Sequence, residues 1–450
     1  MKTRALALCP PLAAKNAPKV TPELLASTLA RYSRSNKGID SILDSIDWND
    51  PDRSVDAIFR FVDYGHASIA GMTGSIPVVI DGCSMFLAWK IFEIAQLCDG
   101  QESSTRYIKL DPSNLPHPDE IGIPLHLRAK WRTLMELSFT CYHELYETLD
   151  ARAKADPSIV RLPAGAPEKV ADRLRKNFAL DRSRYYLPFA TKTNAAYVMT
   201  ARVWADTIRQ LDALPLAEAR ACAAALRSEV GKFAPRLLKH SFADPASASQ
   251  ASQLLSHAIE KLRCEGLPTN RIADSTFVSL DSSAPPFYPG VQTIEEGFAG
   301  KENRYSIAGP QIRRMVVRAA WNNMAIAELR DLNRHRSGYR FTPLAPVGFY
   351  LPEGIRHPRH DEFCRTAREF MSELVHTDGA NAYPYGLHLG TQIYFEHSMH
   401  LDKFIYETEL RTGMGAHFRY AEHLSAACGE LLKIAPQLGP FIQIGSAEPE

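Results

Sequence analysis

Hydrophobic residues recur every three or four positions along several stretches of the chain, and this spacing predicts amphipathic helices. One such stretch, 127–150, carries Trp131, Leu134, Met135, Leu137, Cys141, Tyr142 and Leu145. Further helices are predicted over 83–97, 194–211, 216–233, 321–332 and 361–376. Thr21 followed by Pro22 marks the start of a first helix. Another helix resumes over 55–62, after a turn at 49–52.

Other stretches lack this helical spacing. Residues 75–80 form a short β-rich run, 101–107 a polar loop behind the 83–97 helix, and 153–180 a charged loop region. The chain is therefore predicted to mix long helices with short strands.

The second half of the chain repeats the plan of the first. Ser306-Ile-Ala-Gly309 echoes Ser68-Ile-Ala-Gly71, and Lys433-Ile-Ala-Pro436 echoes Lys232-Phe-Ala-Pro235. An apolar run at 312–317 with the helix ending at 332 echoes 76–97. Because these echoes occur in the same order, we predict an internal duplication. The two modules are 1–238 and 301–450, and a linker region at 239–300 is Ala/Ser-rich and then Pro/Gly-rich.

Composition restricts the class of protein. Hydrophobic residues make up 45% and charged residues 23% of 450 positions, as in soluble globular proteins. The 52 basic and 51 acidic residues nearly balance, so no basic field for a nucleic-acid polymer is expected. Any anionic ligand must then be bound by a local cluster of residues. The 8 cysteines form no Cys-x-x-Cys pair, and neither a secretory signal nor a membrane-length apolar run is recognised. We therefore expect a cytoplasmic protein with reduced thiols and no membrane partner.

Such a local cluster is present at Arg334-His335-Arg336, where the helix predicted over 321–332 ends before Gly338. Cationic side chains at this position interact with the last carbonyl groups of the helix or bind a ligand with several anionic oxygens. From these residues alone, a solvated basic helix end is the ordinary alternative.

A second motif lies far away, in Gln101-Glu-Ser-Ser-Thr-Arg-Tyr107. Together the two motifs resemble the signature of the flavin-dependent thymidylate synthases, which is Arg-His-Arg, five residues, then Glu-x-Ser-x-Arg-Tyr. Here the signature is divided. Glu102, Ser104, Arg106 and Tyr107 match its second half, and Arg334-His335-Arg336 match its first half. Each module keeps the half that the other lacks.

The resemblance implies an α+β fold in which each of two tandem modules has a small, mostly antiparallel sheet packed with long helices. It also implies FAD-dependent methylation at C5 of a uracil nucleotide, from dUMP to dTMP. Methylenetetrahydrofolate and NADPH would be the co-substrates. Family members are homotetramers with sites at subunit interfaces, so this chain is expected to form a homodimer of four modules.

Site residues follow from the same resemblance. The nucleotide phosphate would be bound by Glu102, Ser103, Ser104, Thr105 and Arg106, with Arg184 as a further nucleotide ligand. FAD would contact Arg334, His335, Arg336, Ser306, Ser68, Glu102 and Arg202, and Arg334 would also reach the nucleotide. Arg411 aligns with the essential arginine that favours the ionised uracil N3, whereas the first module has Leu211 at that position.

Several positions depart from the family pattern. Asp331 stands where a nucleotide-contacting glutamine is expected, and Thr200, His400 and Asp402 alter the flavin segments. These changes leave two alternatives, namely C5 modification of another pyrimidine nucleotide or a non-catalytic flavin- or nucleotide-binding homologue.

Each candidate side chain also has an ordinary structural role. Arg106, Arg184, Arg202 and Arg411 each have a surface or local ion pair as their alternative. Two groups contain residues of metal-binding type: His397 with His400 on a predicted helix, and His357 with His360 and Asp361. No further ligand spacing supports either site, so none is expected. His66 is expected to hydrogen-bond a loop.

Overall fold

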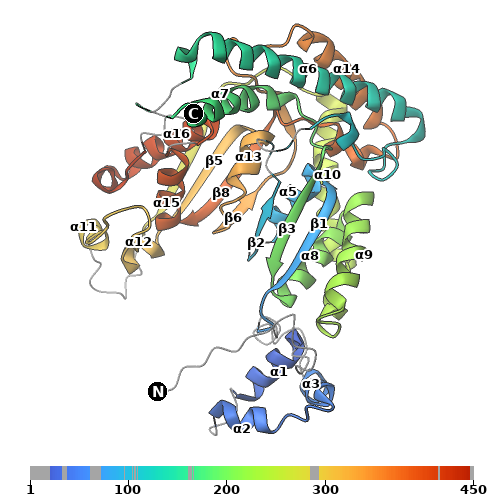
Figure 1. The fold of residues 1–450 in the computed structure, drawn as a ribbon, viewed down its shortest axis with the longest axis vertical. Coiled ribbons are helices and arrows are strands. Elements are labelled where there is room, and N and C mark those ends of the chain that lie inside the picture. Colours follow the sequence, from blue (N-terminus) through green and yellow to red (C-terminus); the bar gives the residue numbers. More distant parts are fainter. Residues whose placement is uncertain are drawn as a thin grey trace. The chain divides into compact units, whose positions relative to one another are not determined.

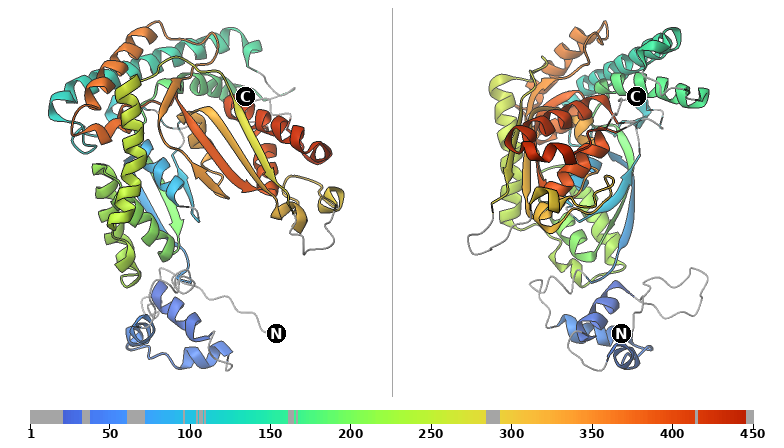
Figure 2. Two further views of the ribbon diagram at one scale, coloured as in Figure 1. Left: turned by 180° about the vertical axis from the view of Figure 1, so that it is seen from behind. Right: turned by 90° about the vertical axis from the view of Figure 1, so that its left-hand side faces the viewer.

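The computed structural model describes residues 21–32, 38–60, 72–95, 97–103, 105, 108, 110–160, 165, 167–283, 293–413 and 416–445. The fold is α+β, with two antiparallel sheets packed with long helices (Figures 1 and 2). The chain divides into two compact units. The first comprises Met1–Cys83, Leu97–Glu102 and Thr193–Gln253, and the second comprises Ser84–Gln96, Ser103–Lys192 and Leu254–Glu450.

The first unit has a three-stranded sheet in the order β1-β3-β2. Trp204 of α8 donates a hydrogen bond to the carbonyl oxygen of Ile76 (2.9 Å), which fixes this helix to β1. The elements of this unit are α1 Pro22–Tyr32, α2 Gly38–Asp44, α3 Pro51–Phe59, β1 Ile76–Ser84, β2 Asp99–Glu102, β3 Lys192–Met199, α8 Ala201–Ala213, α9 Ala217–Gly231, η5 Leu237–His240 and the first residues of α10 Pro245–Glu265.

The second unit has a five-stranded sheet in the order β4-β5-β8-β6, with β7 also paired to β8. Its helices before the sheet are α5 Met85–Ile94, α6 Arg128–Ala155 and α7 Glu168–Ser183, with short 3₁₀ turns η1 Pro112–Asn114, η2 Leu125–Leu127, η3 Pro157–Ile159 and η4 Arg184–Tyr186. The remaining elements are β4 Thr276–Asp281, α11 Ile294–Gly297, α12 Pro310–Arg314, β5 Val316–Ala325, α13 Ile326–Leu332, β6 Tyr339–Phe341, β7 Pro346–Phe349, α14 His360–Leu374, η6 Ala380–Gly386, β8 Thr391–His400, α15 Leu401–Arg411, α16 Phe418–Ile434 and η7 Pro436–Phe441.

Helix α16 packs against β4 and β5. Trp321 of β5 stacks on Phe395 of β8 and donates a hydrogen bond to the carbonyl oxygen of His423 in α16 (3.0 Å). At the start of β5, Val317 and Ala319 are buried whereas Val316 and Arg318 are exposed. This alternation is typical of a sheet with helices over one face.

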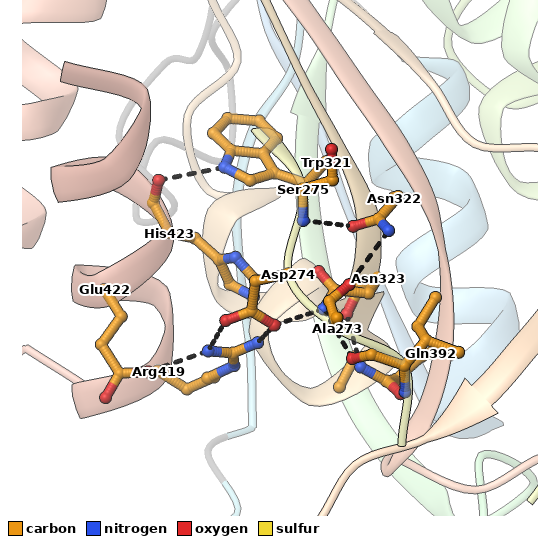
Figure 3. Close-up of polar contacts among 12 residues, drawn as sticks. Ala273, Asp274, Ser275, Trp321, Asn322, Asn323, Gln392, Arg419, Glu422 and His423 are labelled. Carbon is orange, nitrogen blue, oxygen red and sulfur yellow. Dashed lines mark hydrogen bonds and ion pairs between the residues drawn. The ribbon is translucent and has the colours of Figure 1, made fainter. Parts of the chain in front are cut away.

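The loop before β4 is fixed by charged and amide side chains (Figure 3). Buried Arg419 of α16 donates two hydrogen bonds to Asp274, at 2.8 and 2.6 Å. These hydrogen bonds lower the pKa of Asp274 to about 2. Asn322 of β5 accepts a hydrogen bond from the backbone of Ser275 (2.8 Å) and donates one to Ala273 (3.1 Å). The loop is thereby joined to both α16 and β5.

The two halves of the chain share an order of elements. One half runs β1-α5-β2, then η4-β3-α8-α9-η5, and the other runs β5-α13-β6, then η6-β8-α15-α16-η7. Within the second unit, Phe189 donates a backbone hydrogen bond to Leu387, and Leu389 donates one to Leu187, both at 2.9 Å. The order matches the echoes in the sequence, and the duplication itself stays a prediction.

Several predicted elements are confirmed, including the helices over 83–97, 127–150, 216–233 and 361–376 and the strand near 75–80. The first helix begins as predicted, because the Thr21 hydroxyl accepts a hydrogen bond from the backbone of Leu24 (3.1 Å). The turn predicted at 49–52 is confirmed only in part, because the chain turns at 48–49 and α3 begins already at Pro51, before the predicted start of its helix.

Two helix predictions were wrong in part. The first residues of 194–211 belong to β3, and those of 321–332 belong to β5; α8 and α13 begin only at Ala201 and Ile326. Strand β5 is buried on both faces over Ala319–Trp321 and Asn323–Ala325, so its burial does not alternate there and the stretch resembles a buried helix. Strand β3 contains residues of weak β propensity and is held as a strand by pairing on both edges.

Two loop predictions were also wrong in part. Within the loop predicted over 153–180, residues 168–180 belong to helix α7, whose buried stripe includes Leu174 and Phe178 among many charges. Within the loop predicted over 101–107, Gln101 and Glu102 belong to β2. The apolar run at 312–317 is divided between the end of α12 and the start of β5. The segment predicted as a linker contains most of α10 and all of β4, and the module boundaries stay predictions.

Candidate functional site

The Arg-His-Arg motif occupies the turn between α13 and β6 in the second unit. Buried Arg340 of β6 donates hydrogen bonds to the carbonyl oxygens of Asn333 (2.9 Å) and His335 (3.2 Å). It also donates one to the carbonyl oxygen of Phe92 in α5 (2.8 Å). Asn333 donates a hydrogen bond to Trp89 of the same helix (3.0 Å). The turn is thus held by one buried cation and by the end of α5.

Gly338 completes this turn with a φ of +97°. A Cβ atom at this position would meet the carbonyl oxygen of Ser398 in β8 and the side chain of Met399. Glycine therefore allows the close approach of the turn to β8, as well as the left-handed backbone.

Asp331 joins two of the predicted nucleotide-binding arginines. Its carboxylate lies 3.0 Å from the guanidinium of Arg184 and 3.6 Å from that of Arg334. Arg184 is buried, and the carboxylate of Asp181 lies 3.9 Å from its guanidinium. Half of the Arg334 side chain is exposed. Burial alone would lower the pKa of Arg184, but the charges of Asp331 and Asp181 outweigh burial and raise it. Arg184 is committed to internal carboxylates, and Arg334 presents its charge to solvent.

Glu328 is a buried carboxyl group in the first turn of α13, the helix that also carries Asp331. Tyr185 donates a hydrogen bond to Glu328 (2.8 Å), and the other carboxyl oxygen accepts one from the backbone of Ala325 (2.8 Å). Burial raises the pKa of Glu328 to about 7, although Arg419, Tyr185 and Arg184 act in the opposite direction. Glu328 fixes the start of α13, which carries Asp331 and leads into the motif.

His335 is directed to Arg411, the predicted catalytic residue. Nε of Arg411 donates a hydrogen bond to Nε2 of His335, with the two atoms 2.6 Å apart. Arg411 is the last residue of α15, and its guanidinium lies 5.7 Å from the ring centre of Tyr420. Burial and the neighbouring charge of Arg411 lower the pKa of His335 to about 2. The imidazole is therefore uncharged at neutral pH.

Glu407 lies one helical turn before Arg411 and is also buried. Among the described residues, no donor forms a hydrogen bond with its Oε2 atom, which lies 3.5 Å from Nδ1 of His397. Nε2 of His397 is 3.0 Å from the Ser337 carbonyl oxygen. Burial raises the pKa of Glu407 to about 8, although Arg411 and Arg340 oppose the shift. At neutral pH Glu407 is thus mainly a protonated acid beside a neutral histidine.

Arg336 is directed elsewhere, with its guanidinium 4.4 Å from the ring centre of Phe92. The three motif residues therefore engage three different partners: Arg334 pairs with Asp331, His335 with Arg411, and Arg336 stacks on Phe92. The three side chains of the motif thus have different neighbours within the fold.

The other predicted residues are placed as follows. The Ser306 hydroxyl accepts hydrogen bonds from the backbones of Glu302 (3.1 Å) and Asn303 (3.2 Å), within its own turn. Thr105 is buried and Ser103 is partly exposed. In the first unit, Glu102 pairs with Ala195 across β2 and β3, and Arg202 lies in the first turn of α8. Ser68, Ser104, Arg106 and His66 lie outside the described residues.

The histidines weighed for a metal have other partners. His397 and His400 lie on β8, which corrects their predicted helix. Nε2 of His357 lies 2.9 Å from Glu144, and Nδ1 of His360 lies 2.9 Å from the Tyr186 hydroxyl. Among the described residues, no group of three or more His, Cys, Asp or Glu is arranged to hold a metal ion.

Four residues that surround the Arg-His-Arg motif and its partners were not predicted from the sequence: Asp181, Glu328, Arg340 and Glu407. The sequence holds a signal for Glu407, because it precedes Arg411 by four positions on one helix and must share its face. For Arg340 and Glu328 no local signal is present, since their burial depends on strands and helices distant in sequence.

The first half of the chain is similar to known proteins. Residues 18–236 match the family model described as thymidylate synthase complementing protein. A flavin-dependent thymidylate synthase of Clostridium tetani (strain Massachusetts / E88) is 25% identical over 225 residues, which are 49% of this chain and 82% of that protein. The match to the family model ends before the Arg-His-Arg motif, so the correspondence of the second half stays a prediction. Within the described residues, no helix is long and apolar enough to cross a membrane.

Proposed function

We propose that the protein is a flavin-dependent thymidylate synthase-like enzyme that methylates C5 of a uracil nucleotide, with dUMP as substrate. The observation that carries the proposal is the cluster Arg184–Asp331–Arg334. Arg184 belongs to the half that matches the family model, and Arg334 belongs to the other half. The cluster therefore supports a pocket to which both halves of the chain contribute.

Among the described motif residues, Arg334 fits an anionic cofactor best. Arg334 is a half-exposed guanidinium, a group suited to a phosphate of FAD. His335 does not fit this role, because it is buried, uncharged and engaged with Arg411. Arg336, stacked on Phe92, would add charge near the same surface. When bound, the flavin would supply the hydride that completes the new methyl group.

The residues of the chain bind and orient the other partners in this proposal. Arg411 would stabilise the ionised N3 of the uracil ring by charge. Ser103, Ser104, Thr105 and Arg106 would bind the nucleotide phosphate, as the resemblance implies, and Ser68, Ser306, Glu102 and Arg202 would contact flavin. NADPH and methylenetetrahydrofolate would serve as reductant and carbon donor. None of these assignments needs a cysteine nucleophile.

The second part of the proposal is that two diverged modules pool the divided signature. Its support is the shared order of elements and the reciprocal hydrogen bonds between 187–189 and 387–389. A homodimer would then supply four modules, the number of subunits in the family's tetramer.

Purified protein tests the enzymatic proposal. After incubation with FAD and removal of the unbound flavin it should stay yellow, and with NADPH, methylenetetrahydrofolate and dUMP it should form dTMP, identified by mass spectrometry. Arg411→Ala should lower the rate about 100-fold or more while FAD stays bound, because it removes a charge at the reacting ring. The matched control is Arg365→Ala, at an exposed position on α14. Protein that takes up no FAD, or an Arg411→Ala variant with normal turnover, contradicts the proposal.

One observation favours a second candidate substrate. The carboxylate of Asp331 replaces the amide expected at a nucleotide contact, and it accepts hydrogen bonds only. A cytosine ring offers an amino donor where uracil offers a carbonyl oxygen. Parallel assays with dUMP and dCMP, together with rescue of a thymidine auxotroph, distinguish the two. FAD binding without turnover of either would indicate a non-catalytic homologue.

A further inference from the structure

We propose that His335 is a positioning residue for Arg411: its imidazole accepts the Nε–H of Arg411 and leaves the terminal nitrogens of that guanidinium to an anionic pyrimidine ring. This inference rests on the proposed function of the site. It replaces the phosphate-binding role that the resemblance implies for His335.

The geometry fixes the Arg411 guanidinium at two places. Its Nε atom donates a hydrogen bond to Nε2 of His335, 2.6 Å away, and its central carbon lies 5.7 Å from the ring centre of Tyr420. His335 is itself buried, and its ring meets Tyr406 edge-on at 6.3 Å. Within the described part of the chain, the terminal nitrogens of Arg411 make no hydrogen bond. They are the atoms left to bind a ligand.

The protonation state follows from the same contact. Arginine nitrogens only donate, so Nε2 of His335 must carry a lone pair and its proton must lie on Nδ1. The groups that act on His335 come from three elements: Arg411 on α15, Arg340 on β6 and His397 on β8, with Arg334 of its own turn as a fourth. None of these four groups is a carboxylate, and each of them disfavours an imidazolium. The pKa of His335 is accordingly lowered to about 2.

Two substitutions separate positioning from packing. Glutamine places an oxygen acceptor near the position of Nε2, whereas leucine fills the space without one. His335→Leu should weaken dUMP binding about 10-fold or more, because a charge-assisted hydrogen bond is lost. Its FAD dissociation constant should change less than about 3-fold. His335→Gln should restore dUMP binding to within about 3-fold of the unmodified protein, as measured by calorimetry.

The pH dependence distinguishes the two roles directly. An imidazolium bound to a flavin phosphate would release FAD as pH rises through about 6.5. The proposal predicts that the FAD affinity, followed by quenching of flavin fluorescence between pH 5.5 and 8, is the same function of pH in His335→Leu and the unmodified protein. A pH dependence that this substitution abolishes would overturn the proposal, as would equal loss of dUMP binding in the Gln and Leu variants.

A ligand-free measurement separates this inference from the proposed function. Nitrogen-15 spectra of histidine-labelled protein, compared with His335→Gln, assign the resonances of His335. They should show a neutral ring with its proton on Nδ1 down to pH 5. An imidazolium at pH 6 overturns the inference, whether or not the protein binds FAD or dUMP. Failure of both ligands to bind, with the neutral ring present, counts against the proposed function alone.

Discussion

The guanidinium of Arg184 lies 3.0 Å from the carboxylate of Asp331, although the two residues are 147 positions apart. Arg184 is buried and needs a negative partner, and Asp331 supplies it while also lying near Arg334. The carboxylate at position 331 is thus coupled to the burial of an arginine in the fold.

Asp331→Asn should lower the free energy of unfolding by about 3 kcal/mol, because it leaves Arg184 buried with only the more distant Asp181. Urea denaturation measures the change. The control is Glu362→Gln, which breaks the exposed pair with Arg359 and should have little effect. Equal effects of the two substitutions would contradict the assigned role of Asp331.

Glu407→Gln should flatten the pH dependence of stability. The folded pKa of Glu407 is about 8, above its ordinary value of 4.5, so the folded state binds a proton that the unfolded state releases. The stabilisation is complete below pH 4.5 and is lost as pH rises toward 8. Glutamine keeps the shape of the protonated acid without titrating. Thermal melts from pH 5 to 8 should therefore show a smaller decline in the variant, and an unchanged decline would contradict the assignment.

The same argument applies to Glu328 over a narrower range, because its folded pKa is about 7. Glu328→Gln should remove a decline in stability between about pH 4.5 and 7 and have no influence on the decline above that. The two carboxyl oxygens of Glu328 accept hydrogen bonds from Tyr185 and Ala325, whereas a glutamine side chain has only one oxygen that can accept. We therefore expect a variant less stable at every pH, with a flatter profile, measured by the same melts. An unaltered slope below pH 7 would show that Glu328 is ionised in the folded protein.

Gly338→Ala should disturb the turn that carries the Arg-His-Arg motif. The new Cβ would meet the backbone of Ser398, in addition to the strain of the positive φ. Gly354→Ala is the control, because its φ is +69° but nothing lies within 4 Å of the added atom. Gly354→Ala should cost about 1 kcal/mol and Gly338→Ala clearly more. Chemical denaturation compares them, and similar losses would mean that the approach to Ser398 is not restrictive.

Arg419→Met should release the loop before β4, which Arg419 holds through Asp274 (Figure 3). Faster hydrogen exchange is expected at the amide of Ser275, whose hydrogen bond to Asn322 depends on the placement of this loop. Exchange in α6, remote from the loop in sequence, serves as the internal reference. Unchanged protection of Ser275 would show that the asparagine contacts alone hold the loop.

The predicted homodimer can be tested directly by measuring the mass of the protein in solution. Light scattering should report about twice the chain mass of 50.2 kDa, without dependence on FAD. A monomeric mass would contradict a pseudo-tetramer of modules and leave only sites within one chain.

The sequence by itself determined the helices with a clear apolar stripe, such as α6 and α14, and the cap at Thr21. Their patterns are local, so three- or four-residue spacing and capping chemistry suffice to predict them. It also suggested, through a resemblance, the two fragments of a divided signature together with Arg184 and Arg411, and these assignments stay predictions. These positions can be read because a motif depends on residue type and spacing.

Only the tertiary structure decided that 316–325 and 192–199 are strands, because their pairing partners lie far away in the chain. It alone decided what each motif residue contacts. The sequence grouped Arg334, His335 and Arg336 as one anion-binding cluster, whereas folding gives them Asp331, Arg411 and Phe92 as separate partners. Burial and hydrogen bonding set the charge of His335 and Glu407, and both depend on neighbours that local sequence does not reveal.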